Sequence, residues 1–389
     1  MKMKKQLLSN LSNYFYFLLM FFLPISLRIE NVFLGMLFLS TVFNPKKRTP
    51  SNIKYYLLAF FLFTLINGFL NNYLIVEKEN FLRLLPFIFL PFCLEKIDAE
   101  IKLKGLIFLL IGILIIQLHS VYGIIDYYYF TEGKKYPLKN YSKINEILNY
   151  ERPYLGFFSV LNIIICFYYF SMNKKKVLSI LICSFSIGLI IVVSARLAII
   201  IVVPISLIAM CRDFKRKNIA ITLATLIGLV LIIMTSNSSL KDRFSQISKD
   251  ARVVTWKGAT SLFFKSSNYI FGSGSEQNTR DNLLEHYENY DEFCSEDEKN
   301  RFINKNYNTH NQYINELLRG GIVGLLLLLI PQIILFYFGI IRNDTLTLMF
   351  LVAILSFSFV ENILGRQLGV YLYALLLSLT SIPYKAKNK

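Results

Sequence analysis

The sequence contains few charged residues. Lys, Arg, Asp and Glu make up 17% of the 389 residues and hydrophobic residues 54%, whereas soluble domains usually carry about 25% charged residues. The segment 177–211 contains one charge, Arg196. A soluble fold cannot cover so much apolar surface, which excludes a cytosolic enzyme, a disordered chain and a secreted disulfide scaffold. The composition predicts an all-α membrane protein that crosses the bilayer many times.

Patterns typical of metal sites and disulfide frameworks are also missing. The five cysteines show no paired spacing, the three histidines lack the spacing of metal ligands, and no Asp-x-Asp motif lies in a segment predicted outside the membrane. We therefore expect no metal and no cofactor. The formal net charge of +17 comes without any nucleic-acid-binding motif, so nucleic acid is not an expected partner.

Apolar runs long enough to cross a bilayer occur along most of the chain. A spanning helix needs about 20 apolar residues, with about 17 as the lower limit. The first run follows a charged start and continues to about Leu27 without a small-residue cleavage site, which predicts a retained span. We count about twelve spans, at residues 9–27, 30–44, 54–71, 79–94, 103–125, 152–171, 176–193, 195–211, 218–235, 313–341, 345–360 and 363–383.

Basic residues gather in every second connection between these spans. By the positive-inside rule these connections are cytoplasmic, and both termini lie on the same side. The run 177–211 is flanked by basic residues at both ends, so it must cross the membrane twice. One straight helix over it would be about 52 Å long, against ~30 Å for the hydrocarbon core. We therefore expect a turn near Ser194–Ala195–Arg196, on the outer side.

One polar segment is much longer than the others. Residues 235–312 are predicted to form a periplasmic loop between the ninth and tenth spans of a single integral membrane domain, residues 1–389. Within this loop, apolar residues at Val253, Trp256, Leu262 and Phe263 predict a short amphipathic helix on or near the membrane surface.

Three residues on the predicted outer side are candidates for chemistry. A charge at the centre of a span costs at least ~2.5 kcal/mol, so Arg196 is a functional candidate, the alternative being an Arg that snorkels at a hairpin. Arg252 begins the amphipathic stretch, where the alternative is a solvated interfacial charge. Asn308 or Thr309 can cap the tenth span, which would place His310 in its first turn. The alternative there is a capping or interfacial histidine.

This set of residues suits the transfer of a glycan from a lipid diphosphate. Arg grips phosphate oxygens with forked, charge-assisted donors. A helix N-terminus is a further phosphate-binding element, and histidine can accept a proton near neutral pH. Arginines and a helix N-terminus could thus stabilise the leaving diphosphate without a metal.

Several motifs resemble those of the bacterial O-antigen ligases and the related O-antigen polymerases. The stretch Thr309–Gly324 resembles their His-Asn-x-Tyr…Gly-x-x-Gly signature. Arg252-x-x-x-Trp256 followed by Gly272-Ser273-Gly274 is similar to their Arg-x-x-x-Trp…Gly-x-Gly pattern. Ser194-Ala195-Arg196 resembles their Ser-Arg element, although Ala195 interrupts it. The resemblance covers roughly residues 177–370.

The resemblance implies roles for these residues. Arg196 and Arg252 are expected to bind the diphosphate of an undecaprenyl-linked glycan, and His310 is expected to be the catalytic base in direct, inverting transfer without a metal. Supporting roles are expected for four further residues, Asn311, Tyr313, Trp256 and Glu361. For Trp256 we favour a packing anchor over a sugar-stacking platform, and for Glu361 a simple loop-facing charge is an equal alternative.

The resemblance favours a ligase that transfers the glycan to a lipid A–core acceptor in the bacterial inner membrane. The first alternative is an O-antigen polymerase that joins lipid-linked repeat units, because donor and leaving group are the same. A lipid-linked oligosaccharide flippase is the alternative from another class, but a flippase has no need of residues 235–312 as a long outer loop ending just past His310. The sequence does not predict the sugars or the oligomeric state.

Overall fold

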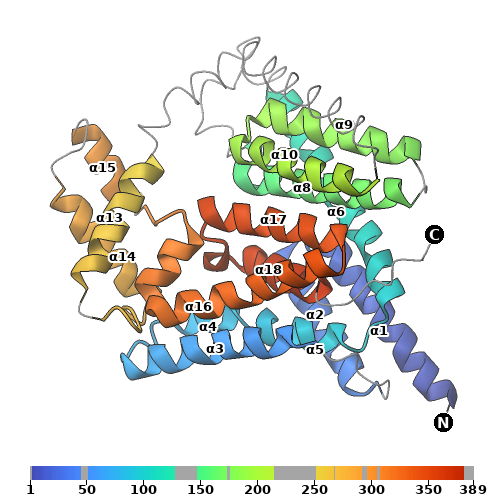
Figure 1. The fold of residues 1–389 in the computed structure, drawn as a ribbon, viewed down its shortest axis with the longest axis horizontal. Helices are drawn as coiled ribbons and strands as arrows, with labels where there is room; N and C mark the ends of the chain where they lie inside the picture. Colours follow the sequence, from blue (N-terminus) through green and yellow to red (C-terminus); the bar gives the residue numbers. More distant parts are fainter. Residues whose placement is uncertain are drawn as a thin grey trace.

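Every regular element that the structure describes is a helix, as the composition predicts (Figure 1). The computed structural model describes residues 2–44, 51–127, 147–172, 176–213, 251–266, 268–290, 296–304 and 307–380. The first helices are α1 (Lys2–Phe22), α2 (Leu27–Val42), α3 (Ile53–Leu70), α4 (Lys78–Arg83), α5 (Pro86–Leu94) and α6 (Ala99–Asp126). They are followed by α8 (Arg152–Ser171), α9 (Lys176–Val193) and α10 (Arg196–Asp213).

Further along the chain, three helices precede the C-terminal bundle. These are α13 (Ala251–Lys265), α14 (Glu276–Glu288) and α15 (Glu296–Asn304). The remaining elements are α16 (Gln312–Ile341), α17 (Thr345–Val360), the short 3₁₀ helix η4 (Ile363–Gly365) and α18 (Gln367–Thr380).

Five of the described helices are long and apolar enough to cross a membrane, namely α3, α6, α8, α9 and α16. Three shorter helices, α10, α17 and α18, are also apolar. The chain is therefore an integral membrane protein with several apolar helices, and the larger count of twelve spans stays a prediction. The span predicted at 218–235 lies outside the described residues.

The span predicted at 79–94 is not one helix. The structure divides it into α4 and α5, with a break at Leu84–Leu85. Pro86 begins α5, and because a proline has no N–H, it cannot donate the backbone hydrogen bond that would continue the preceding helix. The hydropathy of this segment gave no sign of the break.

The predicted turn in the run 177–211 is confirmed. Helix α9 ends at Val193 and α10 begins at Arg196, and between them Ser194 adopts the left-handed backbone conformation (φ +55°). Ala195 packs closely on Gly156 of α8, because a Cβ atom added to Gly156 would lie only 2.8 Å from that of Ala195. The small residue that interrupts the Ser-Arg element thus fits a tight helix–helix contact.

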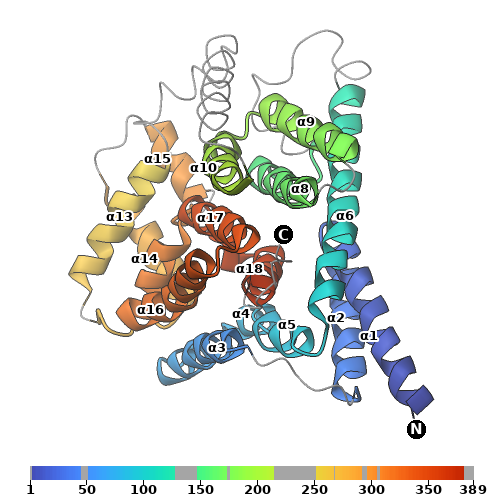
Figure 2. The same ribbon diagram turned by 45° about the vertical axis from the view of Figure 1, so that its right-hand side comes forward.

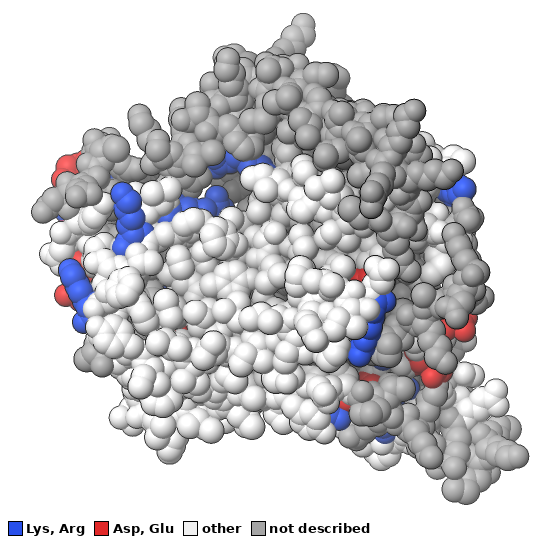
Figure 3. Space-filling view, in the orientation of Figure 1, with Lys and Arg blue, Asp and Glu red and all other residues white. Residues whose placement is uncertain are grey.

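Helix α18 is the centre of the bundle. Every residue from Leu368 to Thr380 is buried, and the helix contacts α3, α5, α16 and α17, which surround it in Figure 2. By contrast, α9 buries only one stripe of residues, as expected for a helix whose other face meets lipid. In Figure 3 the surface over α3 and α16 is almost entirely uncharged.

Helices α13, α14 and α15 form a small unit with its own apolar core. Ala259, Leu283, Tyr287 and Phe302 are buried together, and Ile314 and Leu318 of α16 pack against them. In Figure 1 this unit lies at the left-hand end of the molecule, opposite the N-terminus. The predicted helix near residues 253–263 is therefore present as α13, which packs on α14 and α16; its place at the membrane surface stays a prediction.

The loop between α13 and α14 fills a kink in α16. At Gly321 the backbone of α16 has φ +63° and ψ −160°, a conformation that is essentially restricted to glycine. The N–H groups of Ser273 and Gly274 donate to the carbonyls of Leu318 and Arg319 at 2.9 and 2.8 Å. In return, the N–H groups of Ile322 and Val323 donate to the carbonyls of Tyr269 and Ile270. The loop thus supplies partners to backbone groups of the kinked helix.

Candidate active site

His310 lies immediately before α16 and not in its first turn. The cap is Asn311, whose side-chain oxygen accepts hydrogen bonds from the N–H groups of Tyr313 and Ile314 at 3.0 and 3.1 Å. The expected cap Asn308 instead accepts from the N–H of His310 at 2.9 Å. Our expectation of Asn308 or Thr309 as the cap was wrong, because three residues compete for that position and their spacing alone does not decide between them.

The backbone of His310 is held in an unusual conformation. Its φ of +44° lies in the left-handed region, which costs a non-glycine residue about 1–2 kcal/mol. Such conformations persist where the surroundings fix them, and they cluster at functional sites. Here the Asn308 side chain and the buried residues Thr309 and Asn311 hold the chain on both sides.

Several N–H groups at the N-terminus of α16 already have protein acceptors. The N–H of Asn311 donates to Oδ1 of Asn362 at 2.7 Å, and those of Tyr313 and Ile314 donate to Asn311. Protein acceptors occupy these donors, and the expectation that this helix end helps to bind the diphosphate stays a prediction.

Glu361 joins Arg252 and His310. It directly follows α17, and its side chain is only 8% exposed. Oε1 accepts a hydrogen bond from Nη2 of Arg252 at 3.2 Å, between residues 109 positions apart. Oε2 lies 3.6 Å from Nδ1 of His310, within ion-pair distance, and such catalytic contacts often tighten when substrate binds. The residues of three separate elements thus meet at one carboxylate.

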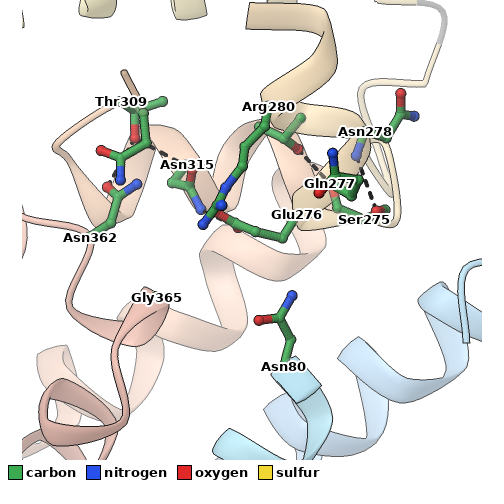
Figure 4. A network of polar contacts seen from close by, with 12 residues as sticks. Asn80, Ser275, Glu276, Gln277, Asn278, Arg280, Thr309, Asn315, Asn362 and Gly365 are labelled. Carbon is green, nitrogen blue, oxygen red and sulfur yellow. Dashed lines mark hydrogen bonds and ion pairs between the residues drawn. The ribbon is translucent and has the colours of Figure 1, made fainter. Parts of the chain in front are cut away.

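Asn362 fixes the segment that carries His310. Its Oδ1 accepts from the Thr309 hydroxyl at 2.9 Å as well as from the N–H of Asn311. On the other side, Nε1 of Trp256 donates to the Thr309 carbonyl at 2.8 Å. Thr309 and Asn362 face each other in Figure 4. Because Asn362 adjoins Glu361 in sequence, the same hydrogen bonds set the positions of His310 and Glu361.

Three of the expected supporting residues make structural contacts. The hydroxyl of Tyr313 donates to Gln332 and to the Leu355 carbonyl, both at 3.2 Å, so it points into the bundle. Trp256 donates to Thr309 and packs edge-on against Phe359, which fits the favoured interpretation of Trp256 as a packing anchor. Asn311 acts as the helix cap.

Arg196 lies at the same end of the bundle. It begins α10, which packs on α8 and α17. The adjacent Ala195 contacts Gly156 of α8, and Tyr154 packs edge-on to Phe357 near the end of α17. Arg196 is half-buried, and Figure 3 shows a hollow between α13 and the α10–α17 pair with Lys and Arg side chains around it.

A polar network beside the site was not predicted from the sequence. Asn315 Nδ2 donates to Glu276 at 2.8 Å, and Glu276 lies 3.6 Å from Arg280, as Figure 4 shows. Directly after Asn315 on α16, Glu316 forms an ion pair of 2.7 Å with Arg319, and Glu316 is completely buried. The only sign of this network in the sequence was the pair of charges Glu316 and Arg319, at positions i and i+3 near the start of an apolar helix. Glu276, the member of the network in α14, lies in another part of the chain.

No group of three or more His, Cys, Asp or Glu side chains with the arrangement of a metal site occurs within the described ranges. Arg252 offers a cation and His310 a base, and the carboxylate of Glu361 contacts both. This arrangement can bind an anionic leaving group beside a proton acceptor.

Comparison with known families agrees with this arrangement. Residues 153–329, just under half of the chain, match the family model described as O-antigen ligase. The match includes Arg196, Arg252 and His310 and ends before Glu361. No curated protein matches the chain. The resemblance drawn from the motifs is thus confirmed: residues 153–329 match the model of a domain that O-antigen ligases and polymerases share and that serves the transfer of lipid-linked glycans.

Proposed function

We propose that this chain is an O-antigen ligase-like glycosyltransferase. It moves a glycan from undecaprenyl diphosphate to a lipid A–core acceptor on the periplasmic face of the bacterial inner membrane. The observation that carries the proposal is the contact of Glu361 with both Arg252 and His310, because it places an anion-binding group next to a base. The match of residues 153–329 supports the general activity, transfer of a lipid-linked glycan.

In this proposal His310 is the general base. Its Nδ1 faces Glu361, which leaves Nε2 for the acceptor. The acceptor hydroxyl oxygen attacks the anomeric carbon of the glycan while its proton passes to Nε2. The bond between that carbon and the diphosphate oxygen breaks, and undecaprenyl diphosphate leaves. A single displacement inverts the configuration at the anomeric carbon.

The leaving diphosphate gains negative charge, and the arginines stabilise it. Arg252 is partly exposed, with 28% of its side chain accessible, so it can contact a ligand while Glu361 orients it. Arg196 supplies a second cation from α10. Forked guanidinium groups bind phosphate oxygens in pairs, and preorganised charges of this kind supply transition-state stabilisation without a metal.

The polymerase is the alternative within the same domain family. It uses the same donor and the same leaving group, so the residues around Glu361 serve both reactions. We favour the ligase on the strength of the His-Asn element and on chain size. Deletion of the gene followed by lipopolysaccharide gel analysis separates the two: loss of all attached glycan indicates a ligase, and a single attached repeat indicates a polymerase.

The mechanism is tested with purified protein, a lipid-diphosphate-linked glycan and an acceptor lipid. His310→Ala is expected to lower the transfer rate by about 10²–10⁴, the usual contribution of a general base, and the protein should stay folded because His310 is not part of the core. His119→Ala changes an exposed histidine of α6 and should retain the full rate. Transfer by His310→Ala at the wild-type rate, or loss of native activity with a chelator, would show the mechanism to be wrong. A flippase would show no transfer at all.

A further inference from the structure

Two turns at the end of the bundle expose many apolar side chains. The first consists of the end of α3 and the turn to α4, and its exposed members are Phe69, Leu70, Leu74, Ile75 and Val76, with Ile75 89% accessible. The second consists of the end of α13 and the turn to α14, and its exposed members are Phe264, Tyr269, Ile270 and Phe271, with Phe264 73% accessible. We refer to these nine residues as the apolar rim. Exposed apolar patches of this kind mark sites of interaction.

The two halves of the apolar rim are joined by polar contacts. Nδ2 of Asn67, in the last turn of α3, donates to the carbonyl of Phe271 at 2.7 Å. Gly274 packs directly on the side chain of Asn71, since an added Cβ atom would lie 2.5 Å from that amide. Segments about 200 residues apart in the sequence therefore form one surface.

The apolar rim continues a stripe of exposed apolar residues on α3. Leu58, Leu62 and Ile66 are exposed at helical spacing, and this stripe runs on into Phe69 and Leu70. Helix α3 is a candidate membrane span, so its exposed stripe faces lipid. Its 18 residues give a length of about 27 Å, slightly less than the ~30 Å hydrocarbon core. The turn that follows must therefore begin within or at the edge of the hydrocarbon.

We propose that the apolar rim is immersed in the bilayer and anchors the α13–α14 unit to acyl chains at the membrane surface. Lys265, exposed between Phe264 and the rest of the turn, fits the anionic headgroups at that depth. The proposal concerns the placement of this surface and does not depend on the reaction.

The apolar rim is connected by hydrogen bonds to the helices that carry the candidate active site. Glu77 directly follows Val76, is buried, and accepts hydrogen bonds from the Ser275 hydroxyl at 2.8 Å and the Gln277 N–H at 3.0 Å. Ser275 is the cap of α14, which packs on α13, the helix that carries Arg252. The depth of the apolar rim in the membrane thus sets the distance of Arg252 from the membrane surface.

Tryptophan fluorescence tests the proposal directly, because the chain contains one Trp. In a Trp256→Phe background, single tryptophans are introduced as Ile75→Trp or Phe264→Trp, and the protein is reconstituted in vesicles of phosphatidylcholine and phosphatidylglycerol with brominated acyl chains. Leu62→Trp, in the middle of α3, is the lipid-exposed control, and Glu285→Trp, exposed on α14, is the water-exposed control.

The expected result is loss of fluorescence for both rim variants in brominated lipid, comparable to that of Leu62→Trp, with little quenching by aqueous acrylamide. Two rim variants are used so that a folding defect in one of them does not decide the test. If both are quenched by acrylamide as strongly as Glu285→Trp, and brominated lipid has no effect on them, the rim lies in water and the proposal is wrong.

Discussion

Oε2 of Glu361 lies 3.6 Å from Nδ1 of His310, although α16 and α17 separate the two residues in the chain. The second oxygen of the same carboxylate accepts from Arg252. A base oriented by a third group is a recurring arrangement in enzymes that activate a hydroxyl. Here the orienting acid also holds a phosphate-binding cation, so the positions of base and leaving group are linked.

Glu361→Gln tests this arrangement. The amide keeps the size of the side chain but loses its charge, and its NH₂ group can donate to Nδ1. That contact favours the imidazole form with a proton on Nε2, which cannot act as a base toward the acceptor. We expect the transfer rate to fall by about 10² or more with unchanged expression. Glu285→Gln, a change of an exposed acid on α14, is the matched control, and equal rates for the two variants would contradict the role of Glu361.

Arg252→Lys tests the diphosphate contact. Lysine keeps the charge but loses the fork that binds two phosphate oxygens. Hydrogen bonds to charged groups contribute about 1.5–3 kcal/mol, so the rate at low donor concentration should fall by about 10- to 100-fold. Arg342→Lys, at the opposite end of α16, should have no effect. A normal rate with Arg252→Lys would mean that this arginine does not bind the donor through its fork.

The sequence predicts the helical class, most helix positions and the turn between α9 and α10, because apolar run length and the spacing of basic residues report on them directly. It also names Arg252 and His310, which the structure connects through Glu361. Neither contact is encoded in a local pattern, since Glu361 follows a different helix. The family match ends before it as well.

Other features could not be read from the sequence for a different reason. The cap of α16 is shifted by two residues from Thr309 to Asn311, because Asn362 binds both Thr309 and the Asn311 backbone. The break before Pro86 divides an apolar run whose hydropathy is continuous. The first of these choices is decided by a residue elsewhere in the chain, and the second by a proline that lacks the N–H needed to continue the helix.

Reporter fusions test the membrane topology, which rests on the basic clusters. Fusions after Lys176 and after Lys217 should both report cytoplasm, and a fusion after Cys294 should report periplasm. This result would place the α13–α15 unit and the surroundings of Glu361 on the periplasmic face. The positions of Lys217 and Cys294 lie outside the described residues, so the fusions supply independent information. A periplasmic signal after Lys217 would contradict the hairpin orientation and the proposed role of Arg196.

Gly321→Ala tests the structural role of the kink in α16. Alanine strongly disfavours the backbone conformation at φ +63° and ψ −160°, and backbone strain of this kind costs about 1–3 kcal/mol. A Cβ atom there would also lie only 2.3 Å from the Ile270 carbonyl oxygen. The contacts between α16 and residues 269–274 should therefore be lost, with lower thermal stability in detergent and weaker transfer.

The matched control for this change is Gly188→Ala in α9. A Cβ atom added at Gly188 meets nothing within 4 Å, and alanine is favoured over glycine in a helix by about 1 kcal/mol. We expect Gly188→Ala to be as stable as the native protein or slightly more stable, with an unchanged transfer rate. Because both variants add the same methyl group to a helix, a difference between them reports on the kink alone. Equal stability for the two would show that the contact between Gly321 and the Tyr269–Gly274 loop does not support the site.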